Sequence, residues 1–203
     1  MNEMYEIQNS MYAEGYNIIC GVDEAGRGPL AGPVYAAAVI LPRGVEIQGL
    51  ADSKKLSAPR REALFDEITS VADSFGIAFA TVQEIEARNI LNATYLAMNR
   101  AMDMLEPKPE LALIDGNQSR GITYPCRVYV KGDDRCALIS AASILAKVAR
   151  DRYMDTLAEM YPNYGFEKHR GYGTKVHYAA LREHGITEVH RRSFLKKLIA
   201  ERG

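Results

Sequence analysis

The feature that most constrains the fold is a stretch from residue 137 to 150 that is apolar on nearly every side. Its centre reads Leu138-Ile139-Ser140-Ala141-Ala142-Ser143-Ile144-Leu145-Ala146-Lys147-Val148. A helix without a polar face is stable where other elements cover it all round. The stretch therefore predicts a central, buried helix, and a chain of 203 residues with 47% hydrophobic content can supply the surrounding core.

Five short apolar runs predict strands on which this helix can pack. They span residues 17–23, 34–41, 75–82, 111–114 and 127–130. The first two are separated by a connection rich in Gly and Pro, so we expect them to pair antiparallel. Helical patterns cover a segment capped by Ser57, residues 84–105 as one or two helices, and residues 175–184, which end at Gly185. Strands interleaved with helices indicate an α/β sheet with helices on its faces.

The chain shows no internal repeat, and we expect one domain over residues 1–203 with a helical extension from about residue 164 to 203. Its cysteines, Cys20, Cys126 and Cys136, lack C-x-x-C spacing, which favours a reduced, cytoplasmic protein. The polar N-terminal segment has no apolar signal region, and no stretch approaches the roughly 20 apolar residues of a membrane span. Secretion and membrane insertion are therefore disfavoured.

Carboxylates follow three of the expected strands, each beside a glycine: Asp23 and Glu24, then Asp115, then Asp133 and Asp134. Acids at strand ends can meet at one edge of an α/β sheet. Their charges would repel and raise each other's pKa, and divalent cations remove that conflict. Oxygen ligands without a Cys or His cluster favour Mg²⁺ or Mn²⁺, and two such ions could clamp the reacting oxygens of a phosphodiester. The alternative is that these acids are ordinary turn and cap residues.

The net charge of −1 conceals an uneven distribution, because basic residues dominate from Tyr164 onward. Tyr172 and two histidines lie among them, which is typical of a phosphate-binding face. The alternative is a solvated helical tail. We expect the four histidines to contact phosphate or to be structural, and Ser140 and Ser143 to be helix-packing hydroxyls rather than nucleophiles.

Several long motifs in a fixed order carry a family resemblance. They are Gly21 to Val34 with its Asp-Glu-Ala-Gly-Arg-Gly centre, Asp52 to Ser57, Ile114 to Asn117, Lys131 to Asp133, Ile139 to Val148, Lys168 to Thr174, and His190 to Phe194. Together they resemble the type 2 ribonucleases H, the family called ribonuclease HII, over nearly the whole chain. A single Asp-Glu-x-Gly would be weak, but this many ordered motifs make a chance match implausible.

The resemblance implies an α/β, ribonuclease H-like fold: a five-stranded mixed sheet flanked by helices, with a helical C-terminal extension. It implies a metal-dependent endonuclease that hydrolyses the RNA strand of RNA–DNA hybrids. It also implies cutting at ribonucleotides embedded in duplex DNA, leaving 3′-hydroxyl and 5′-phosphate ends. The implied protein acts as a monomer, without a membrane partner.

The same resemblance assigns roles to individual residues. Asp23, Glu24, Asp115 and Asp133 would be the catalytic acids that bind Mn²⁺ or Mg²⁺, two ions during catalysis, and the role of Asp134 stays open. Gly26, Arg27, Gly28 and Tyr172 would sense the 2′-hydroxyl, and Lys54 would touch a phosphate near the scissile bond. Farther from the scissile bond, contacts to the nucleic-acid backbone would come from Lys168, Arg170, Arg191 and Arg192.

Three other interpretations compete with this one. A non-catalytic nucleic-acid-binding module would use the basic face without the acids. A nucleotide-binding switch would use residues 26–32 for a triphosphate, but the loop lacks G-x-x-x-x-G-K-[ST]. A type 3 ribonuclease H usually carries an additional N-terminal domain, and we expect too few residues before the first strand to form one.

Overall fold

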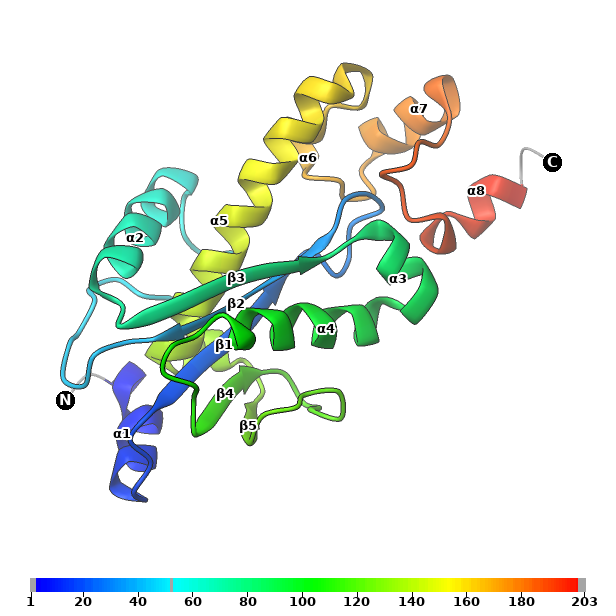
Figure 1. Ribbon diagram of the computed structural model, residues 1–203. Coiled ribbons are helices and arrows are strands. Elements are labelled where there is room, and N and C mark those ends of the chain that lie inside the picture. Colours follow the sequence, from blue (N-terminus) through cyan, green and yellow to red (C-terminus); the bar gives the residue numbers. More distant parts are fainter. Residues whose placement is uncertain (1–2, 52, 201–203) are drawn as a thin grey trace.

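The computed structural model describes residues 3–51 and 53–200, which fold around a five-stranded sheet (Figure 1). In spatial order its strands are β3 (Ser74–Ala80), β2 (Val34–Ile40), β1 (Ile19–Ala25), β4 (Leu111–Asp115) and β5 (Cys126–Tyr129). The β1–β2 and β2–β3 pairs are antiparallel, whereas β1–β4 and β4–β5 are parallel. The expected mixed sheet of five strands, and the antiparallel pairing of its first two, are therefore confirmed.

Helices cover both faces of this sheet (Figure 1). α5 (Ala137–Met160) packs on one face and α4 (Ile90–Asp103) on the other. The pleat of β1 divides its side chains between them, because alternate residues of a strand point to opposite faces. Ile19 joins the apolar cluster on the α5 side, and Cys20 and Val22 join the cluster on the α4 side. The fold thus has three layers, α5, the sheet and α4, with β1 near the centre.

α5 is the predicted central helix, and its first half is almost entirely buried. It approaches β1 so closely that a Cβ on Gly21 would lie 2.1 Å from the Leu138 carbonyl carbon. The helix continues beyond the predicted end at residue 150, because Met154 and Leu157 pack into a further apolar cluster. Among the described residues, no helix has both the length and the apolar character needed to cross a bilayer.

Local capping signals set the other helix boundaries. The Ser57 side chain accepts a hydrogen bond from the Arg60 amide at the start of α2 (Ala58–Val71), as predicted. The segment expected as one or two helices forms two, α3 (Val82–Arg88) and α4. Asn89 separates them with a φ of 65° and caps α4 through its side chain.

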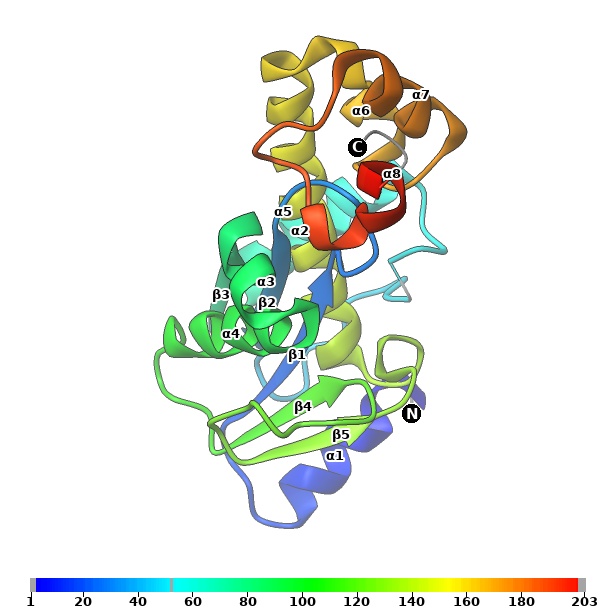
Figure 2. The same cartoon turned by 90° about the vertical axis from the view of Figure 1, so that its right-hand side faces the viewer.

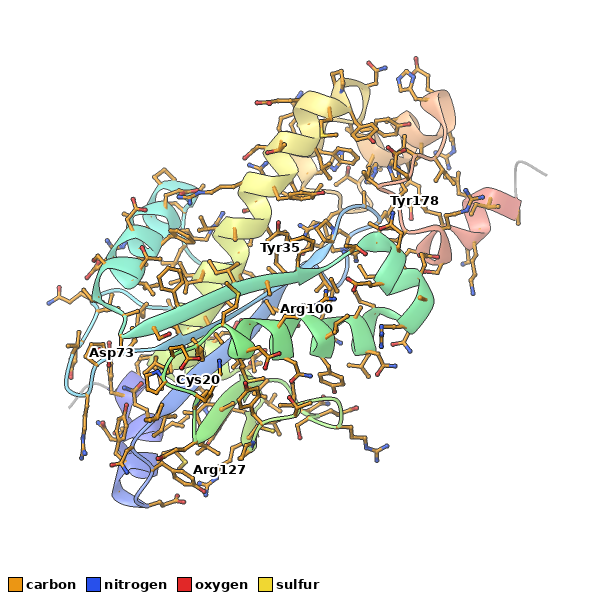
Figure 3. The ribbon with its side chains drawn as sticks, viewed as in Figure 1. Cys20, Tyr35, Asp73, Arg100, Arg127 and Tyr178 are labelled. Carbon is orange, nitrogen blue, oxygen red and sulfur yellow. The ribbon has the colours of Figure 1, made fainter. Side chains whose placement is uncertain are left out.

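The N-terminal segment, for which no element was predicted, forms a short 3-10 turn, η1 (Glu3–Tyr5), and α1 (Glu6–Ala13). Tyr5 and Met11 are buried in the α5-side cluster. Glu14, just after α1, forms an ion pair of 2.6 Å with Arg127 of β5. Arg127 is labelled in Figure 3, at the end of the sheet near α1. The segment is too short and too polar to show a clear helical period, so its order comes from this packing.

The chain after α5 is helical, as expected for the C-terminal extension. It contains η3 (Pro162–Tyr164), α6 (Phe166–His169), α7 (Lys175–His184), η4 (Arg192–Phe194) and α8 (Lys196–Ala200). α7 matches the predicted range, and Gly185 ends it with a φ of 88°. Figures 1 and 2 place these elements around the far end of α5, away from α1. β1 runs toward them, so its carboxyl end faces the extension.

Gly21→Ala should destabilise the protein by about 3 kcal/mol or more, because the added methyl would overlap backbone atoms of α5 that cannot rotate away. Urea unfolding followed by circular dichroism measures this loss. Gly44→Ala is the control: it lies in open space with a φ of 85°, so only backbone strain of about 1 kcal/mol applies. Equal losses in the two variants would contradict the close contact.

Candidate active site

Two neighbouring carboxylates, Asp23 and Glu24, lie near the carboxyl end of β1. The pleat places Asp23 on the α5 face, where its side chain is buried and its Oδ1 accepts a hydrogen bond of 2.7 Å from the Glu24 amide. Glu24 points to the other face, and its Oε1 lies 3.3 Å from Nη1 of Arg27. The two acids therefore have different surroundings although they are adjacent in sequence.

Asp115, the last residue of β4, lies next to Asp23. The parallel register pairs Val22 with Ile114, and one further step along both strands reaches the two aspartates. Oδ1 of Asp115 accepts a hydrogen bond of 2.7 Å from the amide of Gly132. Gly132 begins a 3-10 turn, η2 (Gly132–Asp134), so this bond joins the sheet to the segment that carries the next acid.

Asp133 and Asp134 occupy different positions in η2. Asp133 is buried, and its Oδ2 lies 3.8 Å from Nζ of Lys54. Asp134 is partly exposed and forms an ion pair of 2.7 Å with Lys55. The segment that carries both lysines therefore lies against η2, although about 80 residues separate them in the chain. Asp52 of the same motif lies outside the described residues.

The first three acids influence one another electrostatically. Burial raises the pKa of Asp23 well above its ordinary value, and the charges of Glu24 and Asp115 raise it further. Burial also raises the pKa of Glu24, against the attraction of Arg27. Full ionisation of this group is thus disfavoured in the protein alone, which is the condition that a bound cation would relieve.

Ser143 of α5 contacts this group, a role that the sequence analysis missed. Its hydroxyl interacts with the Asp23 carboxylate and opposes the rise in that residue's pKa. Its Oγ also lies 2.9 Å from Oγ of Ser53, and both hydroxyls are buried. Ser140 donates to the Ala51 carbonyl at 3.0 Å, which agrees with the structural role expected of it. Sequence spacing alone gives no signal for the Ser143 contact, because Asp23 lies on a different element.

The carboxylates predicted to bind metal are near one another but are not arranged around a common centre. Across the part of the chain that the structure describes, no three His, Cys, Asp or Glu side chains meet at the spacing of a bound metal. Asp115 is turned to the Gly132 amide, Glu24 to Arg27, and Asp133 to Lys54. The donor set consists of carboxylate oxygens, and the raised pKa values of Asp23 and Glu24 suit a divalent ion of the Mg²⁺ or Mn²⁺ kind.

A cleft of about 570 Å³, here called the main cleft, joins Glu24 to the glycine-arginine-glycine turn and to Tyr172. A Cβ on Gly28 would lie 3.5 Å from the Tyr172 ring, so the turn and the ring are neighbours. Tyr172 is 46% exposed, which leaves much of its surface available to a ligand. The predicted Lys54 lines this cleft too, together with Ser53, Ile90, Ser143, Lys147, Arg150 and Phe194.

A second, smaller cleft of about 150 Å³ shares Glu24 and Arg27 as walls. Asp115 borders it, and so do the amide side chains of Asn117 and Gln118. Its apolar wall comes from α4 and the end of β4, through Leu91, Tyr95, Met98 and Ile114. Glu24 thus lies between two hollows. The sequence analysis identified Glu24, Arg27 and Asp115 of the smaller one but not its α4 wall, because the residues of α4 read as core.

The connection between β1 and β2 is held by two buried arginines. Arg150 of α5 donates to the carbonyls of Ala31, Pro33 and Arg170, at 3.1–3.2 Å. Arg191 donates to the carbonyls of Gly26, Arg27 and Gly32, at 2.7–2.9 Å. The prediction that Arg191 tracks a nucleic-acid backbone is therefore wrong, because its side chain is wholly enclosed and engaged by the protein's own carbonyls.

The other members of the predicted basic face differ in exposure. Lys168 and Arg192 are exposed, whereas Arg170 is half-buried and ion-paired with Asp155. Of the histidines, His169, His177 and His190 are buried. Burial lowers the pKa of His177 and of His190 to about 4, so both are neutral near pH 7 and serve the structure.

A mixed sheet with carboxylates at the ends of the neighbouring strands β1 and β4, and a cleft beside them, is the arrangement found in nucleases of the ribonuclease H class. A family model described as Ribonuclease HII matches residues 20–197. The chain belongs to the ribonuclease HII family. It is therefore a hydrolase with ribonuclease H activity, which is directed at RNA–DNA hybrids.

Individual relatives agree with this assignment. The chain is 48% identical over 195 residues to the ribonuclease HII of Caldicellulosiruptor saccharolyticus, covering 96% of this chain and 95% of the relative. Its fold is similar to that of the ribonuclease H2 of Pyrococcus horikoshii OT3, with a TM-score of 0.75, 26% identity, and coverage of 89% and 96%. The Bst ribonuclease HIII in complex with Mn²⁺ shares the fold at 18% identity, with a TM-score of 0.70 and coverage of 92% and 70%.

Asp23→Asn should stabilise the protein by about 1–3 kcal/mol at pH 8 without metal, because it removes a buried charge beside two other acids. An acid whose pKa is raised on folding lowers stability as pH rises from about 4 through its folded-state pKa. The gain should therefore shrink at pH 5. Urea unfolding in chelator at both pH values measures it, with the exposed Glu67→Gln as the matched control. A variant less stable than wild type at pH 8 would refute the electrostatic account.

Proposed function

We propose that this ribonuclease H is a metal-dependent endonuclease that cuts the RNA strand of RNA–DNA hybrids and also cuts at single ribonucleotides within duplex DNA. One observation carries the proposal: Glu24, the turn at residues 26–28 and Tyr172 line the same cleft. A carboxylate of the proposed metal site thus borders a surface suited to a sugar. A nuclease indifferent to ribose would need the first of these features only.

Asp23, Glu24, Asp115 and Asp133 are the residues that would hold the metal, Mn²⁺ or Mg²⁺, as two ions during catalysis. Their oxygens match the ligand preference of both ions, and Mn²⁺ is the ion named for the Bst ribonuclease HIII. When bound, divalent ions supply the positive charge and the activation of water that phosphodiester hydrolysis needs. Without them the raised pKa values of Asp23 and Glu24 oppose full ionisation.

The protein's own contacts orient these carboxylates. The Glu24 amide and the Ser143 hydroxyl hold Asp23, and the Gly132 amide holds Asp115. Fixed carboxylates lose little conformational entropy when substrate and metal arrive. Water attacks phosphorus as the bond to the 3′-oxygen breaks, which leaves a 3′-hydroxyl on one fragment and a 5′-phosphate on the other.

Recognition of ribose falls to Gly26, Arg27, Gly28 and Tyr172. Glycines let backbone amides approach a sugar closely, and a tyrosine offers both a ring and a hydroxyl. The closeness of Gly28 to the Tyr172 ring supports a joint role for the turn and the tyrosine. Lys54 lies between Asp133 and the main cleft, a position suited to the phosphate next to the cut bond.

The wider binding surface would use exposed cations. Lys168 and Arg192 point to solvent on the C-terminal extension, so they can follow the phosphates of a duplex. We also propose that residues 1–203 act as one catalytic domain and as a cytoplasmic monomer. Burial raises the pKa of the Cys20 thiol to about 12, so this cysteine is an unreactive thiol.

The proposal is tested with duplexes that contain zero, one or several ribonucleotides, each incubated with Mg²⁺, Mn²⁺ or chelator. Cleavage should require both a metal and at least one ribonucleotide, and mapping of the ends should find 3′-hydroxyl and 5′-phosphate. Binding without any cleavage would favour a non-catalytic module instead.

Asp115→Asn and Asp133→Asn should each reduce metal-dependent cleavage at least 100-fold while the circular dichroism spectrum stays that of wild type, because each removes a carboxylate charge from the site. Asp134→Asn is the matched control, since Asp134 pairs with Lys55 and has no place in the proposed site. Initial rates on a hybrid substrate measure the effect. Undiminished cleavage by the Asp115 variant would refute the site.

Tyr172→Ala should weaken cleavage at a lone ribonucleotide about tenfold more than cleavage of a long hybrid, because a long hybrid offers many alternative ribose contacts. Tyr172→Phe separates the ring from the hydroxyl, and it should keep the part of the activity that depends on stacking. The comparison uses kcat/KM on both substrates. Equal losses on the two substrates would argue against ribose reading by Tyr172.

A further inference from the structure

Arg191 joins both ends of the loop that contains the glycine-arginine-glycine turn. Its Nη2 donates to the Gly26 carbonyl at 2.7 Å, its Nη1 to the Arg27 carbonyl at 2.9 Å, and its Nε to the Gly32 carbonyl at 2.9 Å. The backbone of the same segment reinforces this, because the Arg191 amide donates to the Leu30 carbonyl at 2.7 Å. Arg191, a residue of the C-terminal extension, thus holds the backbone of the turn and of the loop that follows it.

These hydrogen bonds fix the direction of two backbone amides. In a planar trans peptide the N–H points opposite to the C=O of the same unit. The carbonyls of Gly26 and Arg27 point to Arg191, so the amides of Arg27 and Gly28 point away from it. Among the hydrogen bonds of the described residues, none engages either amide. Both residues line the main cleft, which leaves two oriented donors at its wall.

A guanidinium is specifically suited to this position. The Arg191 side chain is 0% exposed and, among the residues that the structure describes, forms no ion pair with a carboxylate. Burying a charge without a counter-ion is costly, and here the three carbonyls compensate it. Burial lowers the pKa of Arg191 to about 9, so the group keeps its charge at neutral pH. A lysine could not serve three carbonyls in one plane.

We propose that Arg191 is a positioning residue for ribose recognition: by holding the Gly26 and Arg27 carbonyls, it aims the amides of Arg27 and Gly28 at the 2′-oxygen of the substrate sugar. The inference rests on the proposed function, in which this turn reads ribose. Arg191 itself touches neither substrate nor metal, so its effect is on preference for ribose rather than on the hydrolytic step.

The test measures binding preference, defined as the Kd for an all-DNA duplex divided by the Kd for the same duplex with one ribonucleotide. Fluorescence anisotropy in Mg²⁺ is used, with Asp115→Asn in every protein to prevent cutting. Adding Arg191→Ala should lower the preference about tenfold, the equivalent of one lost hydrogen bond. Millimolar guanidinium chloride, far below denaturing concentrations, should restore it by filling the vacated site.

Leu64→Ala in the same background controls for lost stability, because Leu64 is buried in the core and lines neither cleft. It should keep the preference and should not respond to guanidinium. An unchanged preference in folded Arg191→Ala, or an equal fall in Leu64→Ala, would overturn the proposal. If Arg191→Ala does not fold, Arg191→Lys replaces it, and full preference in that variant overturns the proposal equally.

These measurements distinguish a failure of the role given to Arg191 from a failure of the proposed ribose recognition. If the Asp115→Asn parent shows no preference for the ribonucleotide duplex, the proposed ribose recognition fails. If the parent shows the preference and the Arg191 variants retain it, ribose recognition stands and the role of Arg191 alone is refuted.

Discussion

The contact between β1 and α5 at Gly21 is the constraint on which the rest of the structure depends. Because residue 21 has no side chain, the backbone of α5 can come close to β1 at this point. About a turn and a half farther along α5, the side chain of Ser143 then meets Asp23, which lies two residues farther along β1. The same approach makes the first half of α5 the wall of both the core and the main cleft. The packing of the core and the position of the acids therefore depend on the same contact.

The site combines two kinds of charge that water no longer shields. Asp23 and its neighbouring acids are crowded on one side, and Arg150 and Arg191 are enclosed on the other. They do not neutralise each other, since the arginines are engaged by carbonyls of the connecting loop. The acids thereby stay available to cations, and the loop gains rigidity without consuming a carboxylate. A direct ion pair between the two groups would lower the pKa of the acids and occupy the oxygens that a cation would need.

Features with local causes could be predicted from the sequence. Ser57 before a helix and Gly185 after one act through neighbouring amides and backbone angles, so their effect is visible in a few residues. The strands and the buried helix were likewise apparent from apolar runs. Arg191 was misread because its partners lie about 160 residues away, and an arginine in a basic segment looks solvated until those carbonyls are found. α1 and the contact of Ser143 with Asp23 escaped for the same reason, since tertiary neighbours create them.

One stripe of α5 connects the acids to the C-terminal extension. Ser143, Lys147, Arg150, Met154 and Leu157 recur at the spacing of one helix face, and they touch in turn the acids, the main cleft, the connecting loop and the C-terminal extension. At 1.5 Å per residue, the span from Ser143 to Leu157 is about 21 Å, the length of roughly six base pairs. α5 therefore fixes the distance between Ser143, beside the acids, and the C-terminal extension, and inserting or deleting residues between Ser143 and Leu157 would change that distance.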